Sequence, residues 1–280
     1  MKVAVTAASG NLGSAIIKQL VSEIGKENVI GIARTPEKAK HLKVQIKKGD
    51  YNIKSDFDEA LKGVDLVLIV SGMDHPDMRI DQHRNIIDAA KDAGVRKLVY
   101  TSIIGKDGSS TFDAIVNSNR QTEKDIMDSG LQWAIGRNGL YIEPDLEYIE
   151  QYKKMGKIAN CAGDGICSYT TRNELAFAYT NLILNDDLNF RIYNLAGEAI
   201  TQQQLTDYLN LAFSTKLIYE EMDPEEYLVY QKEVNGEFLG TVIAGIYSKI
   251  RDGEFNVESD FENAAGRKHI DWEEYFMLFR

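Results

Sequence analysis

The chain has 280 residues, of which 44% are hydrophobic and 27% are charged, and this composition is typical of a globular protein. Its formal net charge of −11 argues against a nucleic-acid partner, because nucleic-acid binding depends on basic side chains that neutralise phosphates. The longest apolar run, residues 64–70, is too short to cross a bilayer and contains Asp65, so we expect no membrane segment. The N-terminus lacks the pattern of a secretory signal, and we therefore expect a cytoplasmic protein.

β-rich runs alternate with helical patterns through the first half of the chain. Strands are predicted at residues 3–6, 28–33, 44–46, 65–70, 97–101 and 131–135. Helices are predicted at residues 12–24, near Pro36, at 55–62 with caps from the opening Ser-Asp-Phe-Asp, at 78–93, and through 121–128. Strands that alternate with helices form parallel sheets with right-handed crossovers. The pattern therefore predicts an α/β fold of the Rossmann type, with a doubly wound parallel sheet.

The alternation weakens after about residue 140. Helices are predicted at residues 175–184, 201–213 and, for the most part, 225–251, and strands at 191–195 and 216–220. We expect residues 1–140 to form the Rossmann domain. Residues 141–280 are expected to form a smaller C-terminal lobe, partly interleaved with the sheet, that shapes a substrate pocket at the edge of the sheet.

The two cysteines, Cys161 and Cys167, are separated by five residues and have no histidine near them. One such pair is a poor zinc site, and a pair in the cytoplasm normally stays reduced. We therefore predict no metal site and a structural role for both thiols, with a redox disulfide as the alternative.

A glycine-containing loop lies between the first predicted strand and the first predicted helix, where a phosphate-binding loop belongs. Its sequence is Thr-Ala-Ala-Ser-Gly-Asn-Leu-Gly, residues 6–13. Backbone N–H groups in such a loop approach a pyrophosphate, and the helix N-terminus adds partial positive charge. The residues predicted to bind the cofactor here are Ala7, Ser9, Gly10, Asn11, Leu12 and Gly13. Because Ala7 stands where a glycine is typical, we expect its backbone to avoid a strongly positive φ. A glycine-rich turn without a ligand is the alternative.

The residue after the second strand distinguishes the two nicotinamide cofactors. An acid there binds the ribose 2′-hydroxyl of NAD, whereas an arginine accommodates the 2′-phosphate of NADP. Here it is Arg34, and Lys38 follows one helical turn later. We therefore predict that Arg34 and Lys38 bind NADP(H), with NAD(H) as the alternative. The alternative is that Arg34 is a solvated arginine at the end of a strand with no ligand, which the sequence pattern does not distinguish.

Beyond these patterns, the sequence resembles a known family, the NmrA-like, atypical short-chain dehydrogenases/reductases. Within that family it is most similar to type 2 NADPH:quinone oxidoreductases and triphenylmethane reductases. The matching segments are residues 10–13, 33–39, 49–52, 82–90, 93–95, 100–102, 122–124, 137–141, 162–165 and 171–174. Together they cover residues 1 to about 200, and the last eighty residues match more loosely.

The resemblance implies roles for further residues. Asp50 and Tyr51 would approach the adenine, and Val70, Ser71 and Gly72 would line the middle of the cofactor. Lys124, Arg137, Asn138, Gly139 and Tyr141 would lie near the nicotinamide and the substrate. Ser71, Thr101 and Asn138 follow predicted strands, Ser102 comes directly after Thr101, and ligands bind at the carboxyl ends of parallel strands. Lys124, Asn138 and Tyr141 are the predicted catalytic residues.

The typical dehydrogenase of this fold has a Tyr-x-x-x-Lys pair, in which tyrosine protonates the forming alkoxide. Here Arg120 precedes Lys124 by four residues, so that acid is missing. General acid catalysis contributes roughly 10²–10⁴-fold. Acceptors that need no strong acid fit better, for example a quinone or a cationic dye.

We therefore predict an NADPH-dependent reductase of a small conjugated acceptor. One alternative is a non-catalytic NADP(H) sensor, and another is a sugar-nucleotide epimerase or dehydratase. The sequence is also compatible with a homodimer or with a regulatory protein partner. His83, on a predicted helix, is either a proton donor or a packing residue.

Overall fold

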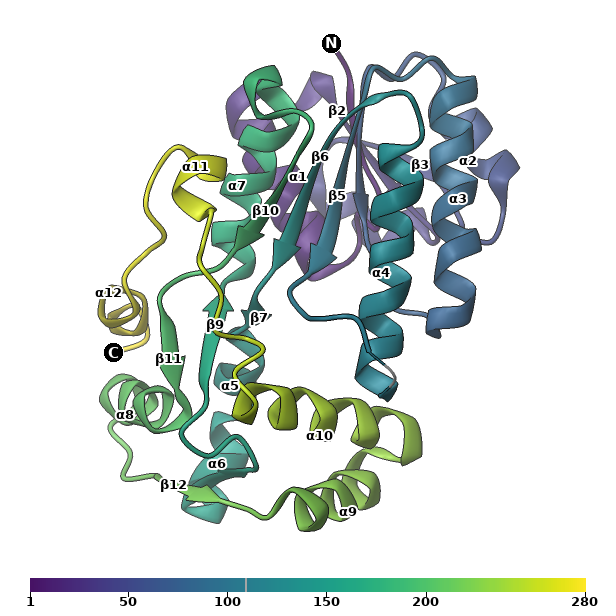
Figure 1. Ribbon diagram of the computed structural model, residues 1–280. Helices are drawn as coiled ribbons and strands as arrows, with labels where there is room; N and C mark the ends of the chain where they lie inside the picture. Colours follow the sequence, from purple (N-terminus) through teal and green to yellow (C-terminus); the bar gives the residue numbers. More distant parts are fainter. Residues whose placement is uncertain (109) are drawn as a thin grey trace.

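The central feature of the molecule is a seven-stranded parallel sheet, seen in a computed structural model that describes residues 1–108 and 110–280 (Figure 1). Its strand order is β10-β6-β5-β4-β1-β2-β3. These strands are β1 (Val3–Val5), β2 (Val29–Ala33), β3 (Gln45–Lys48), β4 (Leu66–Val70), β5 (Lys97–Ile103), β6 (Gln132–Asn138) and β10 (Arg191–Leu195). The order reverses direction between β1 and β4, as in a doubly wound sheet. The predicted fold class is confirmed.

Helices cover both faces of this sheet. On one face α1 (Asn11–Ile24) packs against α7 (Arg172–Leu184). On the other face α2 (Lys54–Ala60), α3 (Pro76–Asp92) and α4 (Thr111–Met127) lie side by side. Alternate residues of each strand point to opposite faces, so Val3 and Val5 join the core under α1 while Ala4 joins the core under α3. Both faces of β1 and of β4 are therefore apolar.

The C-terminal part of the chain lies mostly beyond the carboxyl ends of these strands (Figure 1). A three-stranded sheet consists of β7 (Leu140–Tyr141), β9 (Ile166–Thr170) and β11 (Ala199–Thr201), and β8 (Lys157–Asn160) pairs with β12 (Ile218–Glu221). The helices here are α5 (Glu143–Glu147), α6 (Ile149–Met155), α8 (Gln202–Phe213), α9 (Pro224–Asn235), α10 (Glu237–Arg251), α11 (Phe261–Ala265) and α12 (Trp272–Met277). Three short 3₁₀ segments are η1 (Lys26–Asn28), η2 (Pro36–Leu42) and η3 (Asp186–Leu188).

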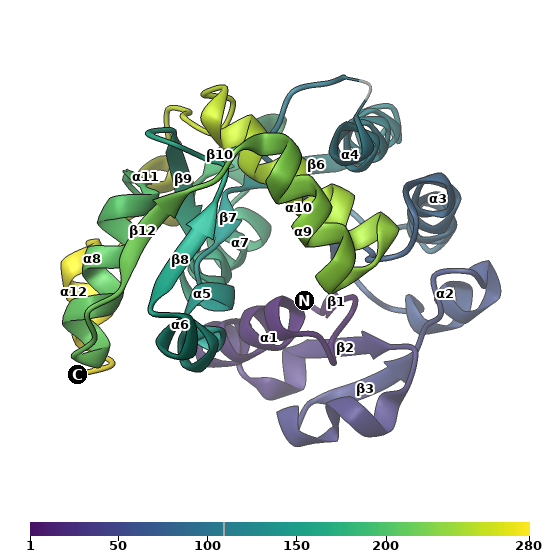
Figure 2. The same cartoon turned by 90° about the horizontal axis from the view of Figure 1, so that it is seen from below.

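Two parts of the chain connect this region to the main sheet. Residues 172–195 return to the sheet as α7 and β10, and β10 pairs with β6 in parallel. Helices α9 and α10 lie together, below the sheet in Figure 1 and side by side in Figure 2, and α10 also contacts α4. The predicted division at residue 140, with its partial interleaving, stays a prediction; α7 and β10 follow residue 140 in the chain and pack against α1 and β6.

Several element boundaries differ from the predictions. Helix α4 begins ten residues before the predicted segment, because Ser110 and Asp113 form a capping box at its start. Helix α2 begins after Ile53 and has no side-chain cap, so the predicted caps within Ser-Asp-Phe-Asp are wrong. The short elements β7, β8, β9, β11, α5, α6, α11 and α12 were not predicted. Elements this short depend on tertiary packing and leave little periodicity in the sequence.

Within the part of the chain that the structure describes, no helix has the length and apolar character needed to cross a membrane. The same residues contain no group of three or more histidine, cysteine or acidic side chains that could hold a metal ion. Cys161 and Cys167 are both buried free thiols. Burial raises the pKa of Cys161 to about 11, so this thiol is a poor nucleophile at neutral pH.

Candidate functional site

The loop between β1 and α1 leaves the N-terminus of α1 open to a ligand. Its N-cap residue is Gly10, no side chain caps the helix, and its first turn contains no acidic residue. Ser9, Gly10 and Asn11 are exposed, whereas Leu12 and Gly13 are buried. A Cβ atom at Gly13 would lie 2.4 Å from the carbonyl oxygen of Ala7, so only glycine fits there. The loop therefore offers unpaired N–H groups and positive dipole to a phosphate.

Ala7 adopts a left-handed conformation with a φ of 48°. The expectation that its backbone avoids positive φ is therefore wrong. A single alanine can occupy this region at a cost of about 1–2 kcal/mol. The surrounding contacts determine the turn here, since the N–H of Ala8 donates to Ile32 O and that of Gly10 donates to Ala7 O.

Arg34 and Lys38 are both exposed beyond the carboxyl end of β2. Among the described residues, neither side chain forms an ion pair or a hydrogen bond. Because β2 runs parallel to β1, its carboxyl end lies at the same edge of the sheet as the glycine loop. The open helix N-terminus and these two free cations fit a dinucleotide that carries an extra phosphate.

Tyr51 closes a ring of three hydrogen bonds. Its hydroxyl donates to the carbonyl of Val70 at 2.6 Å and lies 2.6 Å from Thr6 Oγ1, and Thr6 Oγ1 accepts from the N–H of Val70 at 2.9 Å. The Tyr51 hydroxyl is thus engaged, and its ring is the part left for contact with an adenine. The carboxylate of Asp50 accepts from the backbone N–H of Asn52 and so stabilises this turn.

His83 fixes the loop after β4 as a neutral imidazole. Its Nε2 accepts from the N–H of Gly72 at 3.1 Å, and its Nδ1 lies 2.9 Å from Thr122 Oγ1. Since the Thr122 hydroxyl donates to Ser118 O, the hydrogen between His83 and Thr122 belongs to Nδ1. Burial, followed by the positive charge of Arg79, lowers the pKa of His83 to about 3. Of the two predicted roles, the structure favours the packing role over proton donation.

Ser71 is the centre of a polar cluster between β4 and β5. Its N–H donates to Thr101 Oγ1 at 2.9 Å, and its hydroxyl lies 3.2 Å from both Asn119 Oδ1 and the Tyr100 hydroxyl. Arg79 on α3 donates to the same Ser71 hydroxyl. Asn119 and Arg79 were not predicted. The available signal was their place in helices at the spacing of inward-facing positions.

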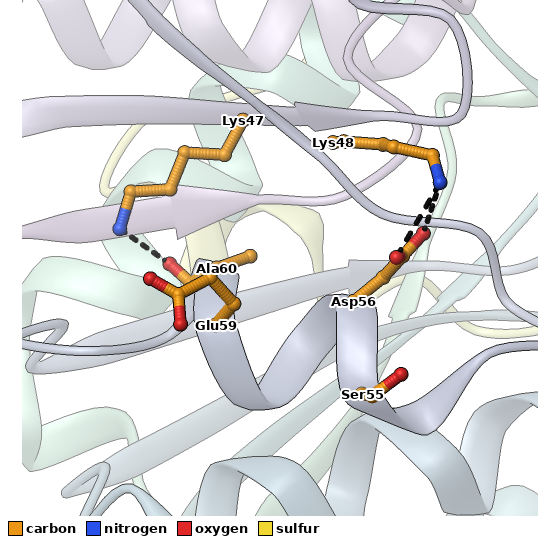
Figure 3. Close-up of a pocket in the computed structure, with 6 residues that line it drawn as sticks. All are labelled: Lys47, Lys48, Ser55, Asp56, Glu59 and Ala60. Carbon is orange, nitrogen blue, oxygen red and sulfur yellow. Dashed lines mark hydrogen bonds and ion pairs between the residues drawn. The ribbon is translucent and has the colours of Figure 1, made fainter.

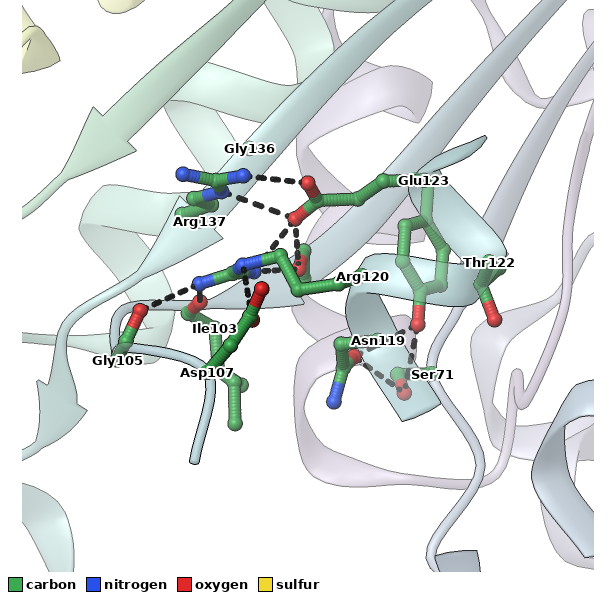
Figure 4. A network of polar contacts seen from close by, with 12 residues as sticks. Ser71, Ile103, Gly105, Asp107, Asn119, Arg120, Thr122, Glu123, Gly136 and Arg137 are labelled. Atoms are coloured by element: carbon green, nitrogen blue, oxygen red, sulfur yellow. Dashed lines mark hydrogen bonds and ion pairs between the residues drawn. The ribbon is translucent and has the colours of Figure 1, made fainter. Parts of the chain in front are cut away.

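A second cluster surrounds the buried carboxylate of Glu123 on α4 (Figure 4). Arg137 donates to both carboxylate oxygens, at 2.9 and 2.6 Å, and Ser102 donates to Oε1 at 2.6 Å. Burial alone would raise the pKa of Glu123. The hydrogen bond from Arg137 and the charge of Arg120 outweigh that effect, so its pKa lies below the ordinary value. Glu123 therefore stays ionised and holds both arginines.

Arg120, in the position of the dehydrogenase tyrosine, is fully occupied by the protein. Its Nη1 donates to Glu123 at 2.7 Å and to Ser102 at 3.2 Å, and its Nη2 donates to the carbonyls of Ile103 and Gly105 at 3.1 and 2.7 Å. Nε faces Asp107 at 3.9 Å. Figure 4 shows the guanidinium enclosed by these groups. Arg120 thus anchors the loop after β5 and offers no proton to a substrate.

Lys124 is not brought into either cluster. It is exposed on α4, whereas its neighbours Thr122 and Glu123 are the buried residues of that turn. Its predicted contact with the nicotinamide stays a prediction, and the described conformation gives it no support.

Asn138, Tyr141 and Tyr179 form a chain of hydrogen bonds at the end of β6. The buried Tyr179 hydroxyl lies 2.5 Å from Asn138 Oδ1 and 2.9 Å from the carbonyl oxygen of Gly136, and Asn138 Nδ2 is 3.1 Å from the Tyr141 hydroxyl. For Asn138, the 2.5 Å distance suits O–H···O and the 3.1 Å distance suits N–H···O, which supports this orientation of the amide. Asn138 therefore donates to Tyr141, and the hydrogen of the Tyr141 hydroxyl is left for another acceptor. Burial raises the pKa of Tyr141 to about 12.

Gly139 lets the chain pass close to β9. A Cβ atom at this position would lie 2.3 Å from the carbonyl oxygen of Ser168. Beyond it, the Arg172 guanidinium lies 5.7 Å from the centre of the Tyr141 ring and pairs with Glu147 at 3.0 Å. These contacts orient the Tyr141 ring.

Two hollows lie away from these clusters. One, of about 330 Å³, is lined by Lys47, Lys48, Ser55, Asp56, Glu59 and Ala60 (Figure 3). Its lysines are engaged, Lys47 with the carbonyl of Ala60 and Lys48 with Asp56. The other, of about 500 Å³, lies between residues 196–199 and 256–269. Neither includes a predicted site residue, so the candidate site is the open edge of the sheet.

Comparison with known proteins agrees with this geometry. A family model described as NAD(P)H-binding matches residues 7–166. The chain is 31% identical to quinone oxidoreductase 2 of Escherichia coli (strain K12) over 236 residues, which cover 83% of this chain and 82% of that protein. It is 28% identical to an NmrA-like family domain-containing oxidoreductase of Aspergillus flavus over 239 residues, which cover 81% and 76% of the two chains.

Solved structures give the same result. The NADPH-dependent quinone oxidoreductase of Escherichia coli, complexed with NADPH, has a TM-score of 0.90 at 28% identity and covers 99% of this chain and 100% of its own. The Citrobacter sp. triphenylmethane reductase complexed with NADP(H) has a TM-score of 0.89 at 28% identity, with 99% of each chain covered. These relatives are oxidoreductases by name, in agreement with the predicted class of enzyme. This chain belongs to the NAD(P)H-binding family, among the NmrA-like oxidoreductases.

Proposed function

We propose that this chain is an NADPH-dependent reductase that transfers a hydride to a small quinone-like or other conjugated acceptor. The preference for NADPH rests on Arg34 and Lys38, exposed cations beyond β2 whose side chains pair with no other described residue. When bound, NADPH supplies the hydride, and a quinone then takes up one proton to become a hydroquinone. The names of the relatives from Escherichia coli and Citrobacter support this class of acceptor.

The observation that carries the proposal is the engagement of Arg120. With Glu123, Ser102 and two backbone carbonyls on its guanidinium, the position that normally holds the proton donor cannot protonate an alkoxide. Reduction of a simple ketone would lack its acid. Hydride addition to a quinone gives a delocalised anion, and hydride addition to a cationic dye gives a neutral product, so both acceptors tolerate this site.

We assign the Tyr141 hydroxyl as the group that donates a hydrogen bond to the acceptor. Asn138 donates to it and Tyr179 orients Asn138, so the Tyr141 hydrogen is directed away from both. Because burial raises its pKa to about 12, the hydroxyl keeps its proton at neutral pH. It would donate a hydrogen bond to a quinone oxygen as negative charge develops there.

The test is an acceptor screen with a Tyr141→Phe variant. NADPH oxidation should exceed the protein-free rate with a benzoquinone and with a triphenylmethane dye, and not with a simple ketone. Tyr141→Phe should lower kcat for the quinone by about tenfold or more, and should affect the cationic dye much less, because that acceptor needs no proton. Tyr148→Phe, at an exposed tyrosine, is the matched control. Rates equal to the protein-free rate across the panel would refute the proposal.

A non-catalytic NADP(H) sensor remains the second candidate, and the same engagement of Arg120 favours it. The sensor predicts tight cofactor binding with no turnover of any acceptor. An epimerase or dehydratase would need the tyrosine that Arg120 replaces, so this third candidate has the least support. A cytoplasmic location and a homodimer or protein partner stay predictions.

A further inference from the structure

Arg79 is a buried arginine that forms no ion pair with any residue the structure describes. It lies on α3 with 5% of its surface exposed. Within the described residues, its one hydrogen bond runs from Nη2 to Ser71 Oγ, and its Nε is buried without any partner. Burial lowers the pKa of Arg79, and Tyr100 and Asp74 oppose that effect only in part. An unpaired charge is costly to bury, so a residue of this kind is a candidate for function.

The position of Arg79 in the fold is on the side of the site where the nicotinamide half of the cofactor would bind. It contacts Ser71, which directly follows β4. In a doubly wound sheet the dinucleotide crosses the edge where the strand order reverses, here between β1 and β4. The phosphates belong to the N-terminus of α1, on the β1 side. The ends of β4, β5 and β6 then face the nicotinamide half, and Arg79 lies there; this step rests on the proposed function.

The other basic side chains described at this edge are paired with a carboxylate, neutral, or exposed to solvent. Arg120 and Arg137 are both paired with the Glu123 carboxylate. His83 is a neutral imidazole, because its Nε2 accepts a hydrogen bond from Gly72. Lys124 is exposed to solvent. Among the described residues of these two clusters, Arg79 is thus the cation that no carboxylate neutralises.

We propose that Arg79 makes the cofactor site selective for the reduced, uncharged nicotinamide ring over the oxidised, cationic ring. The two forms differ by one positive charge on the ring, and a fixed buried cation nearby repels only the oxidised form. Since Coulomb interactions are weakly screened inside proteins, the expected preference is on the order of tenfold. The same repulsion favours release of the oxidised cofactor after hydride transfer.

The test is the ratio of the Kd values for NADP⁺ and NADPH, measured on the full chain. In the wild type NADPH should bind about tenfold more tightly. Arg79→Met and Arg79→Gln should each reduce the ratio by about fivefold or more, mainly because NADP⁺ binds better, whereas Arg79→Lys should keep it. Arg84→Met is the matched control, since Arg84 is a partly exposed arginine on the same helix, paired with Asp125. Replacing a buried unpaired charge by an uncharged side chain is compatible with folding.

Three results would overturn the inference. The wild type could bind both forms equally, which needs no variant to establish. The uncharged variants could leave the ratio unchanged. They could also weaken both forms to the same extent, which would place the Arg79 charge at the phosphates. Failure of the wild type to bind either form would instead refute the proposed function, and the inference with it.

Discussion

Arg34 is the single side chain on which we propose that the choice between NADPH and NADH depends. It is exposed, and the described residues leave its guanidinium free, as they also leave the ammonium of Lys38. An arginine can bind a 2′-phosphate through two parallel hydrogen bonds. By contrast, the guanidinium groups of Arg120 and Arg137 donate hydrogen bonds to the Glu123 carboxylate. The same residue type is therefore a ligand group in one place and a structural group in another.

Replacement of Arg34 by aspartate should reverse the cofactor preference. Loss of a charge-assisted hydrogen bond costs about 1.5–3 kcal/mol, so the Kd for NADPH should rise by about tenfold to a hundredfold. The new carboxylate could accept from the ribose hydroxyls of NADH, whose Kd should fall. Titration of both cofactors measures this, with Lys18→Asp, an exposed site on α1, as a control for total charge. An unchanged affinity of Arg34→Asp for NADPH would show that the 2′-phosphate lies elsewhere.

At the scale of elements, the contact between the β1–α1 turn and the first turn of α1 determines the shape of the phosphate loop. Ala7 has a positive φ, and its carbonyl oxygen lies where a Cβ atom of residue 13 would otherwise be placed. Helix α1 begins without a side-chain cap, and its first N–H groups are left for a ligand. The loop and the helix thus form one unit, and its geometry requires that Gly13 has no Cβ atom.

Gly13→Ala should disrupt this unit. The new Cβ atom would lie 2.4 Å from the Ala7 carbonyl oxygen, so the turn must shift. We expect a loss of about 1–3 kcal/mol in the free energy of unfolding and weaker binding of NADPH. Gly10→Ala is the graded comparison, because its Cβ atom would lie 3.3 Å from the same oxygen and its φ is −82°. Denaturation and cofactor titration of both variants decide it; equal effects would contradict the steric account.

At the scale of the whole molecule, α3 and α4 are joined to the sheet edge through His83. The imidazole connects the loop after β4 to Thr122 of α4, and the bond that its Nε2 accepts from Gly72 requires the neutral form. Burial, and then the Arg79 charge, lowers its pKa in the folded state to about 3, from the ordinary histidine value of 6.5. Between those two pKa values the unfolded chain binds a proton that the folded chain does not. The free energy of unfolding must therefore fall as the pH is lowered from 6.5 towards 3.

Comparison of the wild type with His83→Gln isolates this contribution. Glutamine can accept from Gly72 and donate to Thr122 without titrating. Its free energy of unfolding should fall less steeply between pH 6 and 4, by up to about 1.4 kcal/mol per pH unit, the limit for one proton. Urea denaturation across that range provides the measurement, and His75→Gln, at an exposed histidine, should match the wild type. Parallel curves for His83→Gln and the wild type would disprove the assignment.

Much of the fold could be predicted from local patterns. Apolar runs such as Leu66–Val70, separated by helical periodicity, are sufficient for a parallel sheet covered on both faces. The phosphate loop and Arg34 were predictable for the same reason, because each follows a predicted strand. The short elements beyond residue 140 were not predictable, since a strand such as β7 (Leu140–Tyr141) has too few residues for a periodic pattern and pairs with β9, a strand further along the chain.

The sequence by itself determined the Rossmann-type fold and the edge at which a cofactor belongs, and it pointed to Arg34 as the cation that we propose favours NADPH, because these depend on strand ends and local turns. Tertiary structure alone decided which side chains are engaged there. Arg120 and Arg137 share Glu123, Tyr179 orients Asn138, Lys124 is exposed, and Arg79 bonds to Ser71 but forms no ion pair with any described residue. Those differences follow from burial and from hydrogen bonds between residues far apart in the chain, and these distant contacts leave no local pattern in the sequence.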